Sequence, residues 1–151
     1  MKAGMYALLV ILLTSTALLI DCGAKRYTMK SSEEIFGTWV SDKSNPQKLT
    51  MHPDATWEEY IYQTDPAPSY KGIYEVVEKW KDVEGNIWYK EIVTDTFGLG
   101  KSGKTQELDR IDKSGRVWEL VYNEMGQYDP DNFPKKIDPK HPNYRIYERA
   151  K

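Results

Sequence analysis

The turns constrain this chain most, because short turn signals separate segments that are rich in aromatic and β-branched residues. The signals are Pro53-Asp54-Ala55, Glu84-Gly85-Asn86 and Lys113-Ser114-Gly115. Each supplies a Gly or Asp where a tight reversal of the chain needs a special backbone angle. Links this short leave no room for a crossover helix, so the segments that they join must pair in antiparallel fashion.

Short segments with strand character follow one another from Glu33 to the end of the chain. Their roughly even spacing predicts an all-β sandwich or barrel. In two of them apolar side chains occupy both faces, which argues against a flat sheet with one solvated side. A closed barrel would place one set of these side chains in its lumen. The predicted strands are Gly37–Ser41, Gln47–His52, Thr56–Gln63, Tyr70–Trp80, Ile87–Asp95, Thr105–Asp112, Arg116–Asn123 and Asn143–Arg149.

The amino terminus has the pattern of a secretory signal. Lys2 precedes an apolar run, Met5–Ile20, that only Thr14, Ser15 and Thr16 interrupt. A membrane-spanning helix needs roughly 20 apolar residues, so a cleaved signal is favoured over a permanent anchor. We therefore predict a signal peptide over residues 1–21 and a polar tether over residues 22–32.

The end of the apolar run, Leu19-Ile20-Asp21-Cys22-Gly23, resembles the lipobox of bacterial lipoproteins. Leu19 and Cys22 match that motif, whereas Asp21 stands where a small residue is usual. The resemblance implies cleavage before Cys22, attachment of lipid to Cys22 and anchoring in the cell envelope, at the outer membrane or cell surface. Cys22 is the only cysteine, so it cannot form an internal disulfide. The alternative is an incidental or buried cysteine that follows an ordinary signal.

The exported part also contains motifs of a barrel family. Ile35-Phe36-Gly37-Thr38-Trp39 resembles the Gly-x-Trp signature of lipocalins and lipocalin-like bacterial proteins. Tyr147-Glu148-Arg149 resembles their closing Tyr-x-Arg, and Lys71-Gly72-Ile73-Tyr74 resembles a Gly-x-Tyr of a middle strand. The resemblance implies one domain over residues 33–151, an antiparallel up-and-down barrel of about eight strands. It also implies barrel closure by Trp39, Tyr147 and Arg149, with the arginine lying across the indole ring.

Several classes of function lack their sequence signals. The net charge is −2 with both signs mixed, so nucleic acid is not expected as a partner. Gly98-Leu99-Gly100-Lys101-Ser102 lacks the first glycine of a phosphate loop, and Tyr128–Asn132 lacks the glycine and distal glutamate of a calcium loop. His52 and His141 each adjoin a proline, as surface turn residues often do. We therefore predict no catalytic residue, no metal and no cofactor, although sequence alone cannot show which carboxylates meet in space.

The leading functional hypothesis is a non-catalytic lipoprotein that binds a small apolar or amphipathic ligand in its barrel. The rival is a lipoprotein that binds another protein and whose barrel is filled by its own side chains. An envelope enzyme is a third hypothesis. Small eight-stranded barrels can be filled or can hold one ligand, so strand number does not decide between the first two.

The longest connections between predicted strands should gather at the barrel end opposite Trp39, because the chain returns to each end after two strands. These connections are Asp42–Pro46, Thr64–Ser69, Thr96–Lys104 and Glu124–Pro142. Loops on a rigid scaffold commonly carry recognition. We expect contacts with a ligand or partner from aromatic residues of the strands and of these loops: Tyr60, Tyr62, Tyr74, Trp88, Trp118, Phe97, Tyr128 and Phe133.

Overall fold

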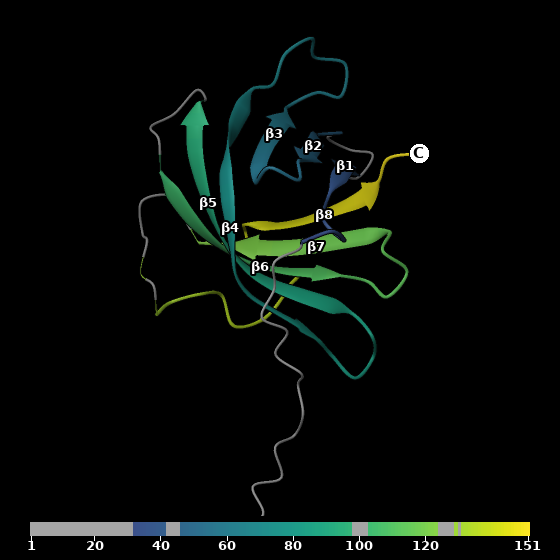
Figure 1. Cartoon of the computed structure of the whole chain (residues 1–151), viewed down its shortest axis with the longest axis vertical. Helices are drawn as coiled ribbons and strands as arrows, with labels where there is room; N and C mark the ends of the chain where they lie inside the picture. The colour runs from purple at the N-terminus through teal and green to yellow at the C-terminus, as the bar shows by residue number, and fades with distance from the viewer. Residues whose placement is uncertain (1–31, 42–45, 98–102, 124–128, 130) are drawn as a thin grey trace, which may run out of the picture.

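The chain folds into a closed barrel, shown in Figure 1 as a computed structural model that describes residues 32–41, 46–97, 103–123, 129 and 131–151. Each strand pairs antiparallel with its neighbour in sequence, and the first strand pairs with the last through Trp39 and Arg149. The predicted all-β up-and-down barrel is therefore confirmed. Its strands are β1 Gly37–Ser41, β2 Lys48–Met51, β3 Thr56–Tyr60, β4 Tyr70–Lys81, β5 Ile87–Phe97, β6 Lys104–Ile111, β7 Val117–Tyr122 and β8 Tyr144–Arg149.

The three short turns reverse the chain where the sequence predicted. Gly85 and Gly115 adopt φ angles of 92° and 69°, which glycine reaches without steric cost. In the turn between β2 and β3 the positive φ of 65° belongs to Ala55, not to a Gly or Asp. Asp54 supports that turn differently, because its Oδ1 accepts the backbone N–H of Thr56 at 3.0 Å.

The third predicted strand differs most from the observed one. The sequence predicted Thr56–Gln63, whereas β3 ends at Tyr60. Beyond it, Asp65 Oδ2 accepts the backbone N–H of Tyr62 at 3.1 Å, so the chain turns instead of continuing the ladder. The ends of the other strands agree with the prediction to within two residues.

Side chains alternate between the lumen and the outside along the central strands. On β5 and β6 the odd-numbered positions face inward, and Glu91 is directly opposite Glu107 in the ladder. A bulge between Val76 and Glu78 reverses the alternation in β4. Tyr74 therefore lies in the buried core before the bulge, whereas Trp80 lies on the outer side after it.

The described part of the connection between β7 and β8, residues 131–143, runs along the outside of the barrel (Figure 1). Gln106, on the outward side of β6, donates through Nε2 to the carbonyl of Asp129 and accepts from the backbone N–H of Asp129 at 3.1 Å. Asn123 Nδ2 donates to the carbonyl of Asn132 at 2.6 Å. The connection therefore covers Gln106, and residues 131–135 lie beside Leu108, so both are buried although they face away from the lumen.

The predicted signal over residues 1–21, and the tether as far as residue 31, lie outside the described residues. At the start of the described chain, the backbone N–H of Ile35 donates to the carbonyl of Ser32 at 3.0 Å, which makes a turn before β1. The described ranges contain no helix with the length and apolar character needed to cross a membrane.

Candidate functional site

One end of the barrel is closed by side chains. Trp39 is fully buried, and its Nε1 donates to the carbonyl of Ile35 at 2.8 Å. The Arg149 guanidinium carbon lies 4.3 Å from the centroid of the Trp39 ring. Arg149 also donates to the carbonyls of Glu34 at 2.5 Å, Phe36 at 2.8 Å and Gly115 at 3.1 Å. This is the arrangement that the lipocalin resemblance implied for Trp39 and Arg149.

Tyr147, the third predicted closure residue, lies deeper in the lumen. Its ring is 6.1 Å from that of Trp118, and Trp118 in turn lies edge-on to Trp39 at 5.4 Å. The Tyr147 hydroxyl donates to Glu59 Oε1 at 3.4 Å. Tyr147 therefore connects the aromatic closure to the acidic part of the lumen.

A cavity of about 320 Å³ lies within the barrel. Its wall includes Gln47, Tyr70, Asp95 and Tyr122, which stand at strand ends next to the connections that follow β1, β3, β5 and β7. The cavity therefore lies toward the end of the barrel opposite Trp39, where the sequence predicted a mouth. Its aromatic wall residues are Trp57, Tyr70, Trp118, Tyr122 and Tyr147, and its aliphatic ones are Leu49, Met51, Val93 and Leu120.

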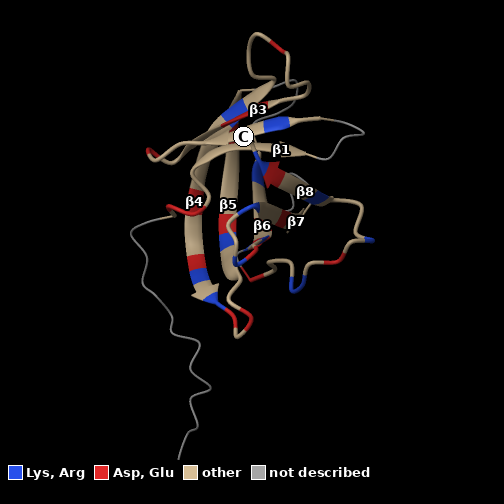
Figure 2. Ribbon diagram, turned by 90° about the vertical axis from the view of Figure 1, so that its right-hand side faces the viewer, with Lys and Arg blue, Asp and Glu red and all other residues tan. Residues whose placement is uncertain are grey.

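The charged side chains of the cavity wall are mainly acidic. Glu59, Asp95 and Glu107 line it, and Arg145 is the basic residue among the described wall residues. Burial raises the pKa of all three carboxyl groups. By contrast, β4 carries both acidic and basic residues (Figure 2), and on the outer side Lys90 Nζ pairs with Glu78 Oε2 at 2.7 Å. The lumen is thus more acidic in character than the surface of a chain whose net charge is −2.

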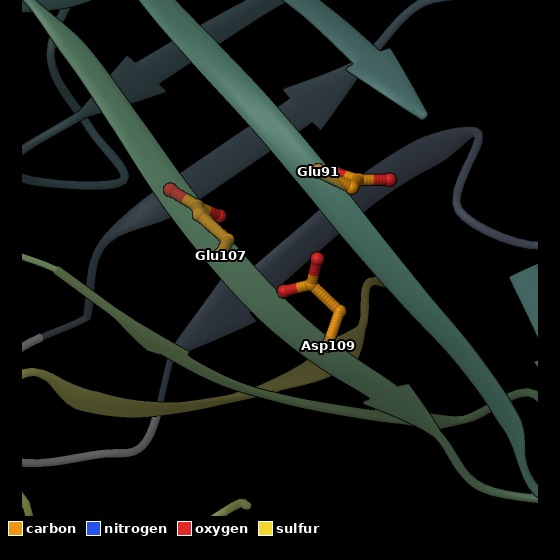
Figure 3. Close-up of side chains that lie close together, drawn as sticks. All are labelled: Glu91, Glu107 and Asp109. Carbon is orange, nitrogen blue, oxygen red and sulfur yellow. The ribbon is translucent and has the colours of Figure 1, made fainter. Parts of the chain in front are cut away.

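Deeper in the lumen, the partly buried Glu107 lies close to two fully buried carboxylates, Glu91 and Asp109 (Figure 3). Oxygen atoms of the three groups lie within 4.8 Å of one another. Asp109 Oδ1 accepts a hydrogen bond from Trp118 Nε1 at 3.2 Å. Asp109 Oδ2 and both carboxylate oxygens of Glu91 have no hydrogen-bond partner among the described residues.

Burial raises the pKa of the Glu91, Glu107 and Asp109 carboxyl groups well above their usual range. The neighbouring carboxylates act in the same direction, because each disfavours a second negative charge beside it. Like charges placed directly opposite each other in a sheet are destabilising, as Glu91 and Glu107 are here. The group can therefore hold protons or a positively charged species.

The sequence prediction did not include these acids. Strict alternation along the predicted strand Ile87–Asp95 puts Glu91 on the same face as Tyr89 and Val93. The partner of Glu91 depends on the register between β5 and β6, which a strand pattern does not specify. The sequence analysis selected aromatic residues as the expected contacts, because they gave the stronger signal.

The predicted aromatic contacts are distributed over several places. Trp118 lines the lumen cavity, and Tyr74 is buried with its hydroxyl donating to the carbonyl of His52 at 2.8 Å. Tyr60 lies on the outer side of β3, with Lys48 Nζ 3.7 Å from its ring centroid, and Tyr62 is 58% exposed. Neither Tyr60 nor Tyr62 lines the lumen cavity, so any contact that they make is with something outside the barrel.

Trp88 and Phe133 line a second hollow, on the outside of the barrel. This outer groove, of about 750 Å³, lies between β4–β6 and residues 131–135 of the last connection. Trp88 stacks on Trp80 there, with ring centroids 5.8 Å apart, and its Nε1 donates to Asp82 Oδ2 at 2.8 Å. Phe133 faces Lys90, whose Nζ is 5.9 Å from its ring centroid. Phe133 thus lies beside the barrel and not over its mouth.

Two of the remaining predicted residues, Cys22 and Tyr128, lie outside the described residues. Phe97 is at the end of β5 and 57% exposed, with Lys71 Nζ 5.2 Å from its ring centroid. No family model matches the chain, and neither the curated proteins nor the solved structures include a match to it.

Proposed function

We propose that this protein is a non-catalytic lipoprotein of the cell envelope that binds a small amphipathic ligand in the lumen of its barrel. The observation that carries the proposal is the lumen cavity of about 320 Å³ with its aromatic and charged wall. Sites for small molecules usually occupy roughly 300–1,000 Å³, with apolar walls and a few polar groups that orient the ligand. The lumen cavity is near the lower limit, which favours a compact ligand.

The charge of the wall narrows the ligand class. A purely apolar ligand would leave Glu59, Asp95 and Glu107 without a polar partner, and a fatty acid would add a further negative charge to them. A ligand with an ammonium or other hydrogen-bond-donating group would be attracted by these acids. Its apolar body would pack against Trp57, Trp118 and the aliphatic wall. We therefore favour an amphipathic amine over an amphipathic acid.

The binding experiment compares a medium-chain alkylamine with the fatty acid of the same chain length, by calorimetric titration of the protein purified as its full exported chain. The amine is expected to bind more tightly than the acid. Leu120→Trp should block binding because Leu120 lines the cavity and a larger ring would fill it. Ile73→Trp is the matched control, since Ile73 is 51% exposed and absent from the cavity wall. Equal binding by both variants, each folded by circular dichroism, would contradict a luminal site.

Native mass spectrometry of the same preparation adds an unbiased search for the natural ligand. A retained molecule with an amine and an apolar body would support the proposal. A retained molecule that persists in a folded Leu120→Trp protein would place its site elsewhere.

Anchoring through Cys22 rests on the amino-terminal sequence and has its own test. Cys22→Ala should move the protein from the membrane fraction to a soluble one, because several acyl chains are needed for stable anchoring at about 0.8 kcal/mol per buried methylene. If the variant stays in the membrane after salt and carbonate washes, the apolar run Met5–Ile20 is an uncleaved anchor.

A protein partner is the second candidate, and the outer groove favours it. Trp80 stacks on Trp88, which stands beside Arg110, and tryptophan and arginine are enriched where proteins bind one another. Trp88→Ala should weaken capture of such a partner and leave the alkylamine titration unchanged. If Trp88→Ala left capture of the partner unchanged, the groove would have no role in recognition.

A further inference from the structure

The acids at the base of the lumen combine three features that an organic ligand in the lumen cavity does not explain. Glu91 and Glu107 are directly opposed across the β5–β6 ladder, and Asp109 follows Glu107 on the same inward face. Their oxygens converge to within 4.8 Å of one another. We refer to Glu91, Glu107 and Asp109 as the acidic triad.

The first step in the argument concerns missing partners. Glu91 is fully buried, and neither of its carboxylate oxygens has a hydrogen-bond partner among the described residues. Asp109 is also fully buried and has a donor, Trp118, at Oδ1 only. A buried carboxylate without compensating donors or charges is expensive, and buried charges are normally paired or bound to a metal.

Within the described ranges, the basic residues Arg145, Arg149 and Lys79 contact groups other than the triad. Arg145 donates to the carbonyls of Pro142 and Tyr144 and to the Tyr122 hydroxyl, near the mouth. Arg149 donates to three carbonyls at the closed end. Lys79 forms an ion pair with Glu34 at 2.5 Å. The three acids therefore lie together without a hydrogen bond from Arg145 or Arg149.

The types of ligand atom in the triad determine which kind of cation it can bind. All the donors are carboxylate oxygens, which suit hard divalent ions, whereas the triad offers no imidazole or thiolate for zinc or copper. Oxygens on opposite sides of a Ca²⁺ ion lie about 4.6–5.2 Å apart, given bond lengths of about 2.3–2.6 Å. The oxygens of the triad lie within 4.8 Å of one another, so they can share the coordination sphere of one Ca²⁺ ion. Mg²⁺, with bonds of about 2.0–2.1 Å, demands a more regular octahedral geometry and gives up its water ligands less readily.

We propose that the acidic triad binds a hard divalent cation, Ca²⁺ in preference to Mg²⁺. Glu107 also lines the lumen cavity, so the cation would enter from the mouth and could keep water ligands on the cavity side. Trp118 fixes the orientation of Asp109 from behind, in the way that outer hydrogen bonds commonly orient metal ligands.

This proposal does not depend on the organic ligand. The cation can be tested with metal salts alone, and the alkylamine titration can be run in a chelator. Failure of one experiment therefore leaves the result of the other interpretable.

The test is calorimetric titration of the full exported chain, freed of metal with a chelator, against CaCl₂ and MgCl₂. One equivalent of Ca²⁺ should bind, more tightly than Mg²⁺, and should raise the melting temperature. Glu91→Gln should weaken Ca²⁺ binding roughly tenfold or more, which corresponds to about 1.4 kcal/mol. The double variant Glu91→Gln/Asp109→Asn should abolish it. Glu75→Gln is the matched control, because Glu75 is exposed on the outer side of β4.

Terbium luminescence provides a second measurement on the unmodified chain, in case a variant does not fold. Tb³⁺ replaces Ca²⁺ in oxygen sites and emits when a nearby indole is excited, and Trp118 is hydrogen-bonded to the triad. We expect emission that Ca²⁺ competes away and that Trp118→Phe reduces. The proposal is wrong if neither Ca²⁺ nor Mg²⁺ binds at millimolar concentration. It is also wrong if Ca²⁺ binds equally well to the folded Glu91→Gln/Asp109→Asn protein, because the triad would then be a group that shares protons.

Discussion

Buried polar groups are hydrogen-bonded more completely at the closed end of the barrel than in its lumen. At the closed end, the Trp39 indole donates to a carbonyl and Arg149 donates to three more while covering the indole ring. In the lumen, Trp57 Nε1, Asp109 Oδ2 and both Glu91 oxygens are buried without partners among the described residues. Native structures leave few buried polar groups unsatisfied, and those few call for an explanation. The contrast indicates that the closed end stabilises the fold, and it is a reason for our proposal that the lumen binds a ligand.

The largest effect is expected at the closed end. Trp39→Ala should lower the free energy of unfolding by about 3–5 kcal/mol, because it removes a large buried ring and leaves a cavity. Urea denaturation followed by circular dichroism measures this loss. A loss below about 1 kcal/mol would mean that Trp39 does not close the barrel in the way its contacts indicate.

Two arginines on β8 sharpen the comparison, because one is at each end. Arg149→Met should cost about 2–3 kcal/mol, since buried carbonyls lose their donor and the indole loses its cation. Arg145→Met should cost less, because Arg145 stands at the wall of the open cavity, where water can replace its hydrogen bonds. Both values come from the same denaturation experiment. Equal losses would remove the distinction between the two ends.

In the lumen we expect a substitution to change stability little, or to improve it. Burial raises the pKa of the Glu59 carboxyl group, so its charge is unfavourable in the folded state. Glu59→Gln removes that charge and keeps an oxygen that can accept the hydrogen bond from Tyr147. The free energy of unfolding should rise by up to about 1 kcal/mol, while alkylamine binding weakens. A clear loss of stability, with binding intact, would show that Glu59 serves the fold and not the ligand.

The smallest effect concerns Glu34 beside the closed end. Partial burial raises its pKa, but hydrogen bonds from Lys79 and Tyr89 outweigh this and lower it. A lowered pKa in the folded state stabilises the protein above the unfolded pKa, and this contribution is lost as the pH falls through the folded value. Glu34 is partly exposed, so we expect less than about 1 kcal/mol.

The measurement for Glu34 is the melting temperature of the native chain and of Glu34→Gln between neutral pH and about pH 3. The native chain should be slightly more stable at neutral pH, and the difference should disappear below about pH 4. A difference that grows on acidification would contradict the assigned sign.

The fold could be predicted from the sequence because its determinants are local. Turn residues such as Gly85 and Gly115 specify tight antiparallel links, and the segments between them have strand composition. The closed end could be predicted from the resemblance to lipocalins, since Trp39 and Arg149 stand in recognisable motifs at the two ends of the domain. In the structure, the Arg149 guanidinium lies over the Trp39 ring, as the resemblance implied.

The lumen could not be predicted in the same way, because its composition depends on register and on bulges. A single bulge after Val76 places Trp80 outside while Tyr74 stays inside. The acidic triad depends on which residue of β6 faces Glu91, which no local pattern encodes. The last connection packs against Gln106 outside the barrel, so that Phe133 lies away from the mouth where its loop was expected.

The most direct test of a luminal site uses the indole N–H signals of the five tryptophans as position markers in an NMR titration. Trp57 and Trp118 line the lumen, Trp39 closes the barrel, and Trp80 and Trp88 stand in the outer groove. On addition of the alkylamine, we predict that the signals of Trp57 and Trp118 shift while those of Trp80 and Trp88 do not. Shifts confined to Trp80 and Trp88, or no shift at all, would contradict a lumen that binds the ligand.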